Sequence, residues 1–138
     1  MNLKTLTLSG AQLDYATAIA LNLDVELKLT EFNRGLTKSP EGKYQSYIPF
    51  VHGERYQPTS DWNECSRIIT QHLIGVTPYW SFSLDSRRVA WQARQLRDIC
   101  NDECDYVFYG VTPLEAVLLC FVFITLGEYV DIPPELEK

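Results

Sequence analysis

The chain has little positive charge, no long apolar run and few of the side chains that bind metals. Its 138 residues include 18 acidic and 12 basic side chains, a net charge of −6, and 2 histidines. Because an acidic domain repels phosphate at long range, this balance argues against non-specific binding of nucleic acid. The longest apolar run, Val117 to Ile124, is far shorter than the ~20 residues of a membrane-spanning helix. We therefore expect a soluble protein that binds neither membranes nor bulk nucleic acid.

An export signal and paired metal ligands are also missing. No apolar stretch of about 7–15 residues follows the first lysine, so we expect no signal peptide. The cysteines are then best read as free thiols in a reducing cytosol. They are Cys65, Cys100, Cys104 and Cys120. Cys100 and Cys104 could lie on one helical face, but a zinc site needs two more ligands, and neither histidine has a partner at such spacing. We predict no metal site and no cofactor.

The common catalytic motifs are missing as well. The chain contains no P-loop, GxGxxG, HExxH or GxSxG, which lowers the odds of the commoner chemistries. Cys65 and His72 would lie two helical turns apart, roughly 10 Å, which is too far for a nucleophile and its base. A metal-dependent hydrolase using His52, Glu54 and Asp61 is the least favoured alternative, and we assign no catalytic residue.

The N-terminal half of the chain contains a helical pattern and then strand patterns. Ser9 and Gln12 have the spacing of a capping box, which predicts a helix over residues 10–22. Residues 24–32 alternate apolar and polar side chains, as in a half-buried strand. Residues 33–43 carry glycines, a proline and mixed charges, and are predicted to form an exposed loop. Pro49 predicts that any strand over 44–51 is short or lies at a sheet edge.

The C-terminal half contains the clearest helix signal. Thr112 at the N-cap, Pro113 at N1, Glu115 at N3 and Gly127 after the last turn mark both ends of a helix. This helix is apolar on nearly every face, so it is either the central core helix or has one face against another subunit. Upstream, residues 80–84 and 89–96 predict a hairpin with a polar turn, and 106–109 a further strand. After the helix, residues 133–138 are predicted to form a loose tail.

These patterns predict one α+β domain over residues 1–138. We expect an antiparallel sheet of about four strands, packed by an N-terminal and a C-terminal helix. The segment 62–74 is left open, because its pattern fits either a helix or a short turn followed by a strand.

The least ordinary segment is RYQPTSDWNECSRII, residues 55–69, in which residues 55–67 are predicted to form a corner. Pro58 restricts the backbone, and Thr59, Ser60 or Asp61 can cap a short helical turn. Asp61 and Glu64 have the spacing of a capping box, and we expect Trp62 to pack its ring on the core. The segment is therefore either a rigid structural corner or a corner that also binds a ligand. In the second interpretation an anion meets two arginines while an aromatic ring stacks on a base. The candidate ligand-binding residues are Arg55, Tyr56, Trp62 and Arg67.

Aromatic side chains are concentrated in the middle of the chain. Nine of them are Tyr44, Tyr47, Phe50, Tyr56, Trp62, Tyr79, Trp80, Phe82 and Trp91. A core of this size cannot easily accommodate so many hydroxyl and indole groups, so some should line a cleft or a protein interface.

Several segments together resemble a known family. They read LSGAQLDYA (8–16), YQPTSDW (56–62), WQA (91–93), GVTPLEA (110–116) and VDIPPEL (130–136). This combination resembles the NinX family of small bacteriophage proteins. The resemblance implies a single NinX-like domain of phage origin that acts in the bacterial host cytoplasm, and it brings no catalytic residues.

The resemblance and the residues together favour a non-catalytic phage accessory protein that acts by binding. The leading hypothesis is a pocket that holds a nucleotide-like host molecule or defence signal, because small phage proteins often blunt host defence. The alternative is an adaptor or inhibitor that binds a host or phage protein through the apolar helix over 112–126, or first forms a homodimer through it.

Overall fold

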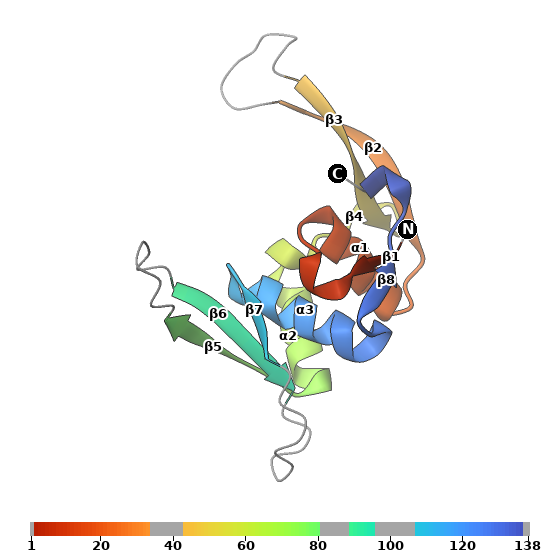
Figure 1. Ribbon diagram of the computed structural model, residues 1–138. Helices are drawn as coiled ribbons and strands as arrows, with labels where there is room; N and C mark the ends of the chain where they lie inside the picture. The colour runs from red at the N-terminus through yellow and green to blue at the C-terminus, as the bar shows by residue number, and fades with distance from the viewer. Residues whose placement is uncertain (1, 34–42, 81–88, 96–106, 137–138) are drawn as a thin grey trace.

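The computed structural model describes residues 2–33, 43–80, 89–95 and 107–136 (Figure 1). The elements in chain order are β1 (Asn2–Lys4), η1 (Thr5–Thr7), α1 (Ala11–Ala20), β2 (Val25–Asn33), β3 (Lys43–Val51), β4 (Glu54–Arg55), η3 (Pro58–Ser60), α2 (Trp62–His72), β5 (Ile74–Trp80), β6 (Val89–Gln95), β7 (Phe108–Gly110), α3 (Pro113–Leu126), β8 (Tyr129–Asp131) and η4 (Pro134–Leu136). Elements labelled η are 3-10 turns. Within the described residues the strands form three small antiparallel sheets, β1–β8, β2–β3–β4 and β5–β6–β7. The predicted α+β class is confirmed.

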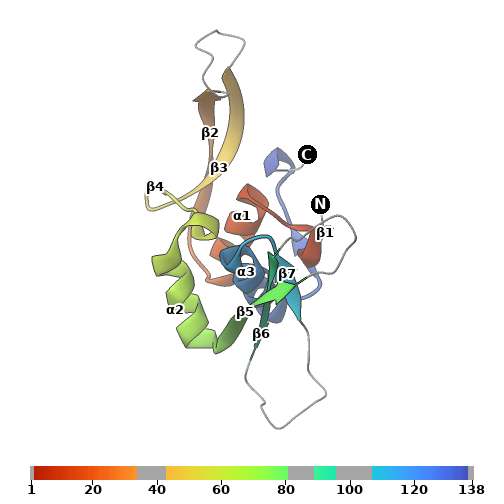
Figure 2. The same ribbon diagram turned by 90° about the vertical axis from the view of Figure 1, so that its left-hand side faces the viewer.

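The strands form three small sheets instead of the one sheet of about four strands that the sequence predicts, and α3 lies at the centre of the molecule. Residues from Ala116 to Val122 on this helix are buried on every side. Such a helix needs cover from several directions. The β5–β6–β7 sheet covers one side, while α1 and α2 pack on others (Figures 1 and 2). The expected core helix is confirmed, and partly exposed side chains are found mainly in its last turn, residues 123–126.

Both ends of α3 form as its sequence predicts. Thr112 Oγ1 accepts a hydrogen bond from the Glu115 N–H (3.1 Å), and Pro113 occupies the first turn. Gly127 follows the last turn with a φ of 95°. Just before the helix, a Cβ on Gly110 would lie 2.5 Å from the backbone nitrogen of Ala116. Glycine at this position therefore lets β7 run directly against the start of α3.

The beginning of α1 and the C-terminal tail differ from their predictions, and the two are linked. The N-cap of α1 is Gly10, without a side-chain bond, so the predicted capping box of Ser9 and Gln12 is wrong. Gln12 Nε2 instead donates to the carbonyl oxygen of Leu136 (2.9 Å). Residues 133–136 are not a loose tail, because Ile132 and Leu136 bury their side chains and η4 packs beside β3. Residues 137–138 lie outside the described residues.

The β2–β3 hairpin projects from the rest of the molecule (Figure 1). The strand predicted over 24–32 is confirmed as β2. The strand around Pro49 is longer than predicted and lies between β2 and β4. Pro49 is tolerated because its carbonyl accepts from the Tyr56 N–H (3.0 Å), so its missing donor falls on the β4 side, where the ladder ends. Most of the predicted loop, residues 34–42, lies outside the described residues.

The segment over residues 62–74, for which the sequence allowed either a helix or a turn and a strand, begins with a helix. Residues 62–72 form α2, and β5 starts immediately afterwards at Ile74. The second predicted strand, 89–96, corresponds to β6, which pairs with β5 in an antiparallel ladder. The first predicted strand, 80–84, lies outside the described residues except for residue 80. The predicted turn, including Arg87 and Arg88, lies outside the described residues. The strand predicted over 106–109 corresponds to β7.

Candidate functional site

The corner is built from β4, η3 and the first turn of α2. Pro58 is fully buried at the start of η3. Asp61 then caps α2, and its Oδ1 accepts from the N–H groups of Asn63 (3.0 Å) and Glu64 (3.4 Å). Glu64 does not complete a capping box, because its carboxylate pairs with Arg67 (2.8 Å). Of the three predicted cap residues, Asp61 is the one that caps α2, and its cap fixes where the helix starts.

A buried carboxylate that the sequence analysis missed attaches this corner to α1. Asp14 is 2% exposed, and its Oδ1 accepts from the Thr59 N–H (2.9 Å). Burial raises the pKa of Asp14 to about 6, while the hydrogen bonds from Thr59 and the charge of Arg55 act in the opposite direction. The only sequence signal was an acidic residue directly beside Leu13 on a mostly apolar helix. Asp14 joins the segments LSGAQLDYA and YQPTSDW.

Tyr56 also belongs to the inner side of the corner. Its hydroxyl is buried and makes no hydrogen bond with the described residues. Burial raises the pKa of this phenol, and the nearby carboxylates of Glu64 and Asp14 raise it further, while Arg67 lowers it. The hydroxyl therefore stays protonated and lies next to acidic groups. Tyr56 is half-buried in the corner, which limits the ring area available to a stacked ligand.

Trp62 faces outward, contrary to the expectation that its ring packs on the core. It is the first residue of α2 and is 55% exposed. The buried stripe of this helix contains Cys65 and Ile68. At about 100° per residue, Trp62 lies at the rim of that stripe. The indole is thus presented to solvent on a capped, well-anchored helix end.

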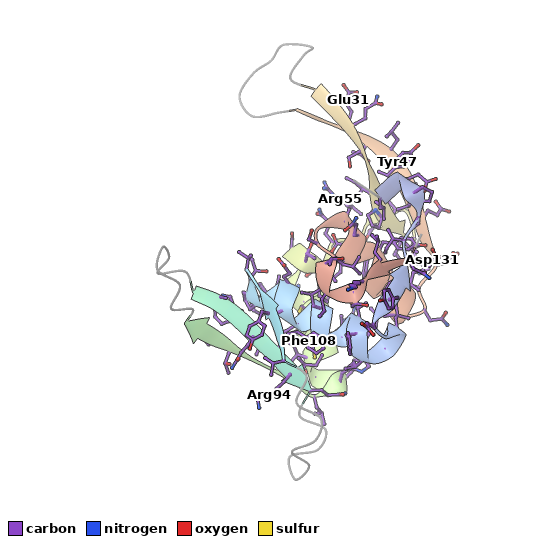
Figure 3. The ribbon with its side chains drawn as sticks, in the orientation of Figure 1. Glu31, Tyr47, Arg55, Arg94, Phe108 and Asp131 are labelled. Carbon is purple, nitrogen blue, oxygen red and sulfur yellow. The ribbon has the colours of Figure 1, made fainter. Side chains whose placement is uncertain are left out.

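Both arginines of the corner are exposed, and each lies near a carboxylate. Arg67 is exposed and paired with Glu64, about 140° around α2 from Trp62. Arg55 is exposed at the end of β4, and its charge reaches Asp14 (Figure 3). The structure therefore links Arg55, Tyr56 and Arg67 through shared carboxylates, while Trp62 points elsewhere. With Asp14, Asp61 and Glu64 at the same corner, the arginines do not create a surplus of positive charge.

The cysteines with described side chains are unsuited to catalysis. Cys65 and Cys120 are free thiols, as expected, and both are buried. Burial raises the pKa of each thiol to about 12, so the reactive thiolate is scarce at neutral pH. His72 packs its ring against Phe121 with centroids 4.6 Å apart. Cys100 and Cys104 lie outside the described residues.

The residues of the hydrolase alternative do not come together. His52 and Gly53 form the tip of the β3–β4 hairpin, with φ values of 53° and 78°, and Glu54 follows on the surface. Asp61 is engaged as the α2 cap. Among the residues that the structure describes, no three His, Cys, Asp or Glu side chains could hold a common metal ion.

A separate hollow of about 360 Å³ lies between η1, the start of α1, β3 and η4. Its lining residues are Thr7, Ser9, Ala11, Gln12, Ser46, Tyr47, Glu135 and Leu136. Figure 3 labels Tyr47 where β3 passes the C-terminal turn. The aromatic count had predicted that some rings line a cleft, and Tyr47 is one of them. The other lining residues could not be found from sequence, because residues 7–12, 46–47 and 135–136 are distant from one another along the chain.

Comparison with known proteins agrees with the motifs. A family model described as "Bacteriophage P22, NinX" matches residues 4–124, from β1 into the last turns of α3. A search of curated proteins finds no match. None of the helices in the described part of the chain has the length and apolar character that crossing a bilayer requires. Because the match extends over most of the sequence, the chain belongs to the bacteriophage NinX family.

Proposed function

We propose that this chain is a non-catalytic phage accessory protein that binds a protein in the bacterial host cytoplasm. The observation that carries the proposal is the exposed indole of Trp62 at the capped start of α2. Tryptophan and arginine are the residues that most often dominate the affinity of protein interfaces. We further propose, from the phage origin alone, that this binding blunts a host defence.

The charges of the corner favour a protein partner over a nucleotide-like ligand. A nucleotide phosphate needs an excess of positive charge, whereas Arg67 is paired with Glu64 and Arg55 lies near Asp14. A mixed surface of this kind complements the mixed charges of another protein. The helix of the adaptor alternative, α3, is largely covered by other parts of this chain, so Trp62 offers the more accessible contact.

Affinity capture from host cytoplasm with three versions of the full chain tests this proposal. A specific partner should be retained by the wild type and lost by Trp62→Ala, because central tryptophans contribute about 2 kcal/mol or more. Leu73→Ala is the matched control, since Leu73 is 58% exposed at the opposite end of α2. That variant should retain the partner.

Titration calorimetry with the captured partner and with nucleotides separates the two ligand classes. We expect Arg67→Ala to weaken the protein complex by up to about tenfold, as for a charge at an interface rim. A partner bound equally well by Trp62→Ala would contradict the proposed surface. Heat from a nucleotide or cyclic nucleotide that disappears in Arg67→Ala would instead support the nucleotide hypothesis.

A further inference from the structure

The hollow between η1, α1, β3 and η4 is a second candidate site, separate from the corner. We infer that it binds a small, neutral, polyhydroxylated molecule such as a monosaccharide or the sugar of a nucleoside. Small-molecule sites usually measure about 300–1,000 Å³. The hollow measures about 360 Å³, which is enough for a compact ligand but not for a polymer.

Unused hydrogen-bonding groups in the lining indicate the chemistry of the ligand. Within the described residues, the side chains of Ser9, Ser46, Tyr47 and Glu135 make no hydrogen bond with the protein. Gln12 donates its amide to Leu136, which orients the side chain and leaves its oxygen as an acceptor. Hydroxyls both donate and accept, so this set is best matched by a ligand that also carries several hydroxyl groups.

The charge of the described lining residues argues against a ligand that carries a phosphate. Among the described residues that line the hollow, Glu135 is the one with a charge, and the whole chain carries a net charge of −6. A phosphate would be repelled by this carboxylate, and no lysine or arginine among the described lining residues balances that repulsion. A neutral polyol avoids that repulsion and can donate its hydroxyl protons to Glu135.

The hollow is assembled by long-range contacts that the fold maintains for other reasons. The Gln12–Leu136 hydrogen bond connects α1 to η4, and Leu136 is buried in the core. Tyr47 packs partly against that core, which limits the movement of its ring. The lining is therefore held in place before a ligand arrives, which reduces the entropic cost of binding.

The test is a titration of the isotope-labelled full chain, followed by backbone amide NMR, with D-glucose, D-ribose, adenosine and adenosine monophosphate. At least one neutral probe should give saturable shifts at millimolar concentration, centred on residues 9–12, 46–47 and 134–136. The monophosphate should bind more weakly than adenosine. Absence of saturable shifts with every neutral probe, or shifts centred on α2, would overturn the inference, as would tighter binding of the monophosphate.

Two variants and a control make the result specific. Glu135→Gln should weaken the neutral probe about tenfold, as expected for loss of a charge-assisted hydrogen bond, and should reduce discrimination against the monophosphate. Ser46→Phe should block binding by filling the hollow. Glu128→Gln removes an exposed carboxylate that is not among the lining residues and should bind like the wild type. Unchanged affinity in Glu135→Gln and Ser46→Phe would place the ligand elsewhere.

Discussion

The corner over residues 55–67 has an inner half and an outer half that differ in what they do. On the inner half, Pro58 is buried and the Thr59 N–H binds the buried carboxylate of Asp14. On the outer half, Trp62 and Arg67 are largely exposed. Substitutions on the inner half should change stability, and those on the outer half should change binding. Gly110 lies outside the corner, but its close approach to α3 is also a structural contact, because it joins the family motif GVTPLEA to the core.

The largest loss of stability is expected for Gly110→Ala. The added methyl would lie 2.5 Å from the backbone nitrogen of Ala116, where no side-chain rotation can relieve the clash. We expect a loss of about 3 kcal/mol or more in the free energy of unfolding, measured by urea denaturation. Val111→Ala is the control, because Val111 is 78% exposed and should lose less than about 0.5 kcal/mol. Equal stability of the two variants would show that β7 can move away from α3.

The next largest effect is the pH dependence that Asp14 imposes on stability. Burial raises its pKa from 3.8 in the unfolded chain to about 6 in the folded protein. At a pH between 3.8 and about 6, the carboxyl of Asp14 holds its proton in the folded protein but has lost it in the unfolded chain. Protonation of Asp14 therefore stabilises the folded protein at low pH, and this stabilisation is lost as the pH rises through about 6. Relative to Asp14→Asn, the wild type should lose about 2–3 kcal/mol between pH 4 and pH 7.

Urea denaturation of both proteins across this pH range measures the difference directly. Asp14→Asn keeps an oxygen that can accept from the Thr59 N–H, so the comparison isolates the charge. Asp14→Ala removes the acceptor and should cost about 1–3 kcal/mol even at low pH. A constant difference between wild type and Asp14→Asn would show that the carboxylate is better solvated than its position indicates.

A smaller effect, of opposite sign, is expected for Tyr56→Phe. The hydroxyl is buried without a hydrogen-bond partner among the described residues, and it lies near Glu64 and Asp14. Removing an unsatisfied polar group while keeping the ring should raise the free energy of unfolding by about 1 kcal/mol. A loss of stability would instead indicate that the hydroxyl is hydrogen-bonded, for example through a buried water.

Local patterns predicted those parts of the fold that depend on local physics. The ends of α3, the β2 strand and the Asp61 cap follow from helix-end chemistry and apolar periodicity, and all are present in the structure. The division into three sheets did not follow, because strand pairing such as that of β1 with β8 joins segments from opposite ends of the chain. The capping box at Ser9 was wrong because Gln12 has a long-range partner, Leu136, that no local pattern reveals.

The candidate site was predictable to a similar degree. The sequence identified the corner and the Asp61 cap among its candidates, but it placed the Trp62 ring on the core, because the buried stripe of α2 was unknown. It also missed Asp14, whose role depends on a contact with Thr59 across 45 positions of the chain. The hollow near Tyr47 depends on three distant segments, residues 7–12, 46–47 and 135–136. Site residues that lie in one segment could therefore be predicted from the sequence, whereas sites that tertiary contacts assemble could not.

The smallest effect on stability is expected on the outer half, for Trp62→Ala and Arg67→Ala. The indole is 55% exposed, and the Arg67–Glu64 pair joins an arginine side chain that is 69% exposed to a helix neighbour. Exposed pairs of this kind contribute about 0–1 kcal/mol, and we expect each variant to lose less than about 0.5 kcal/mol in urea denaturation. If either variant were as unstable as Asp14→Ala, the outer half would be structural too. Near-wild-type stability combined with loss of the protein partner would establish that one short segment folds the corner with its inner side chains and binds with its outer ones.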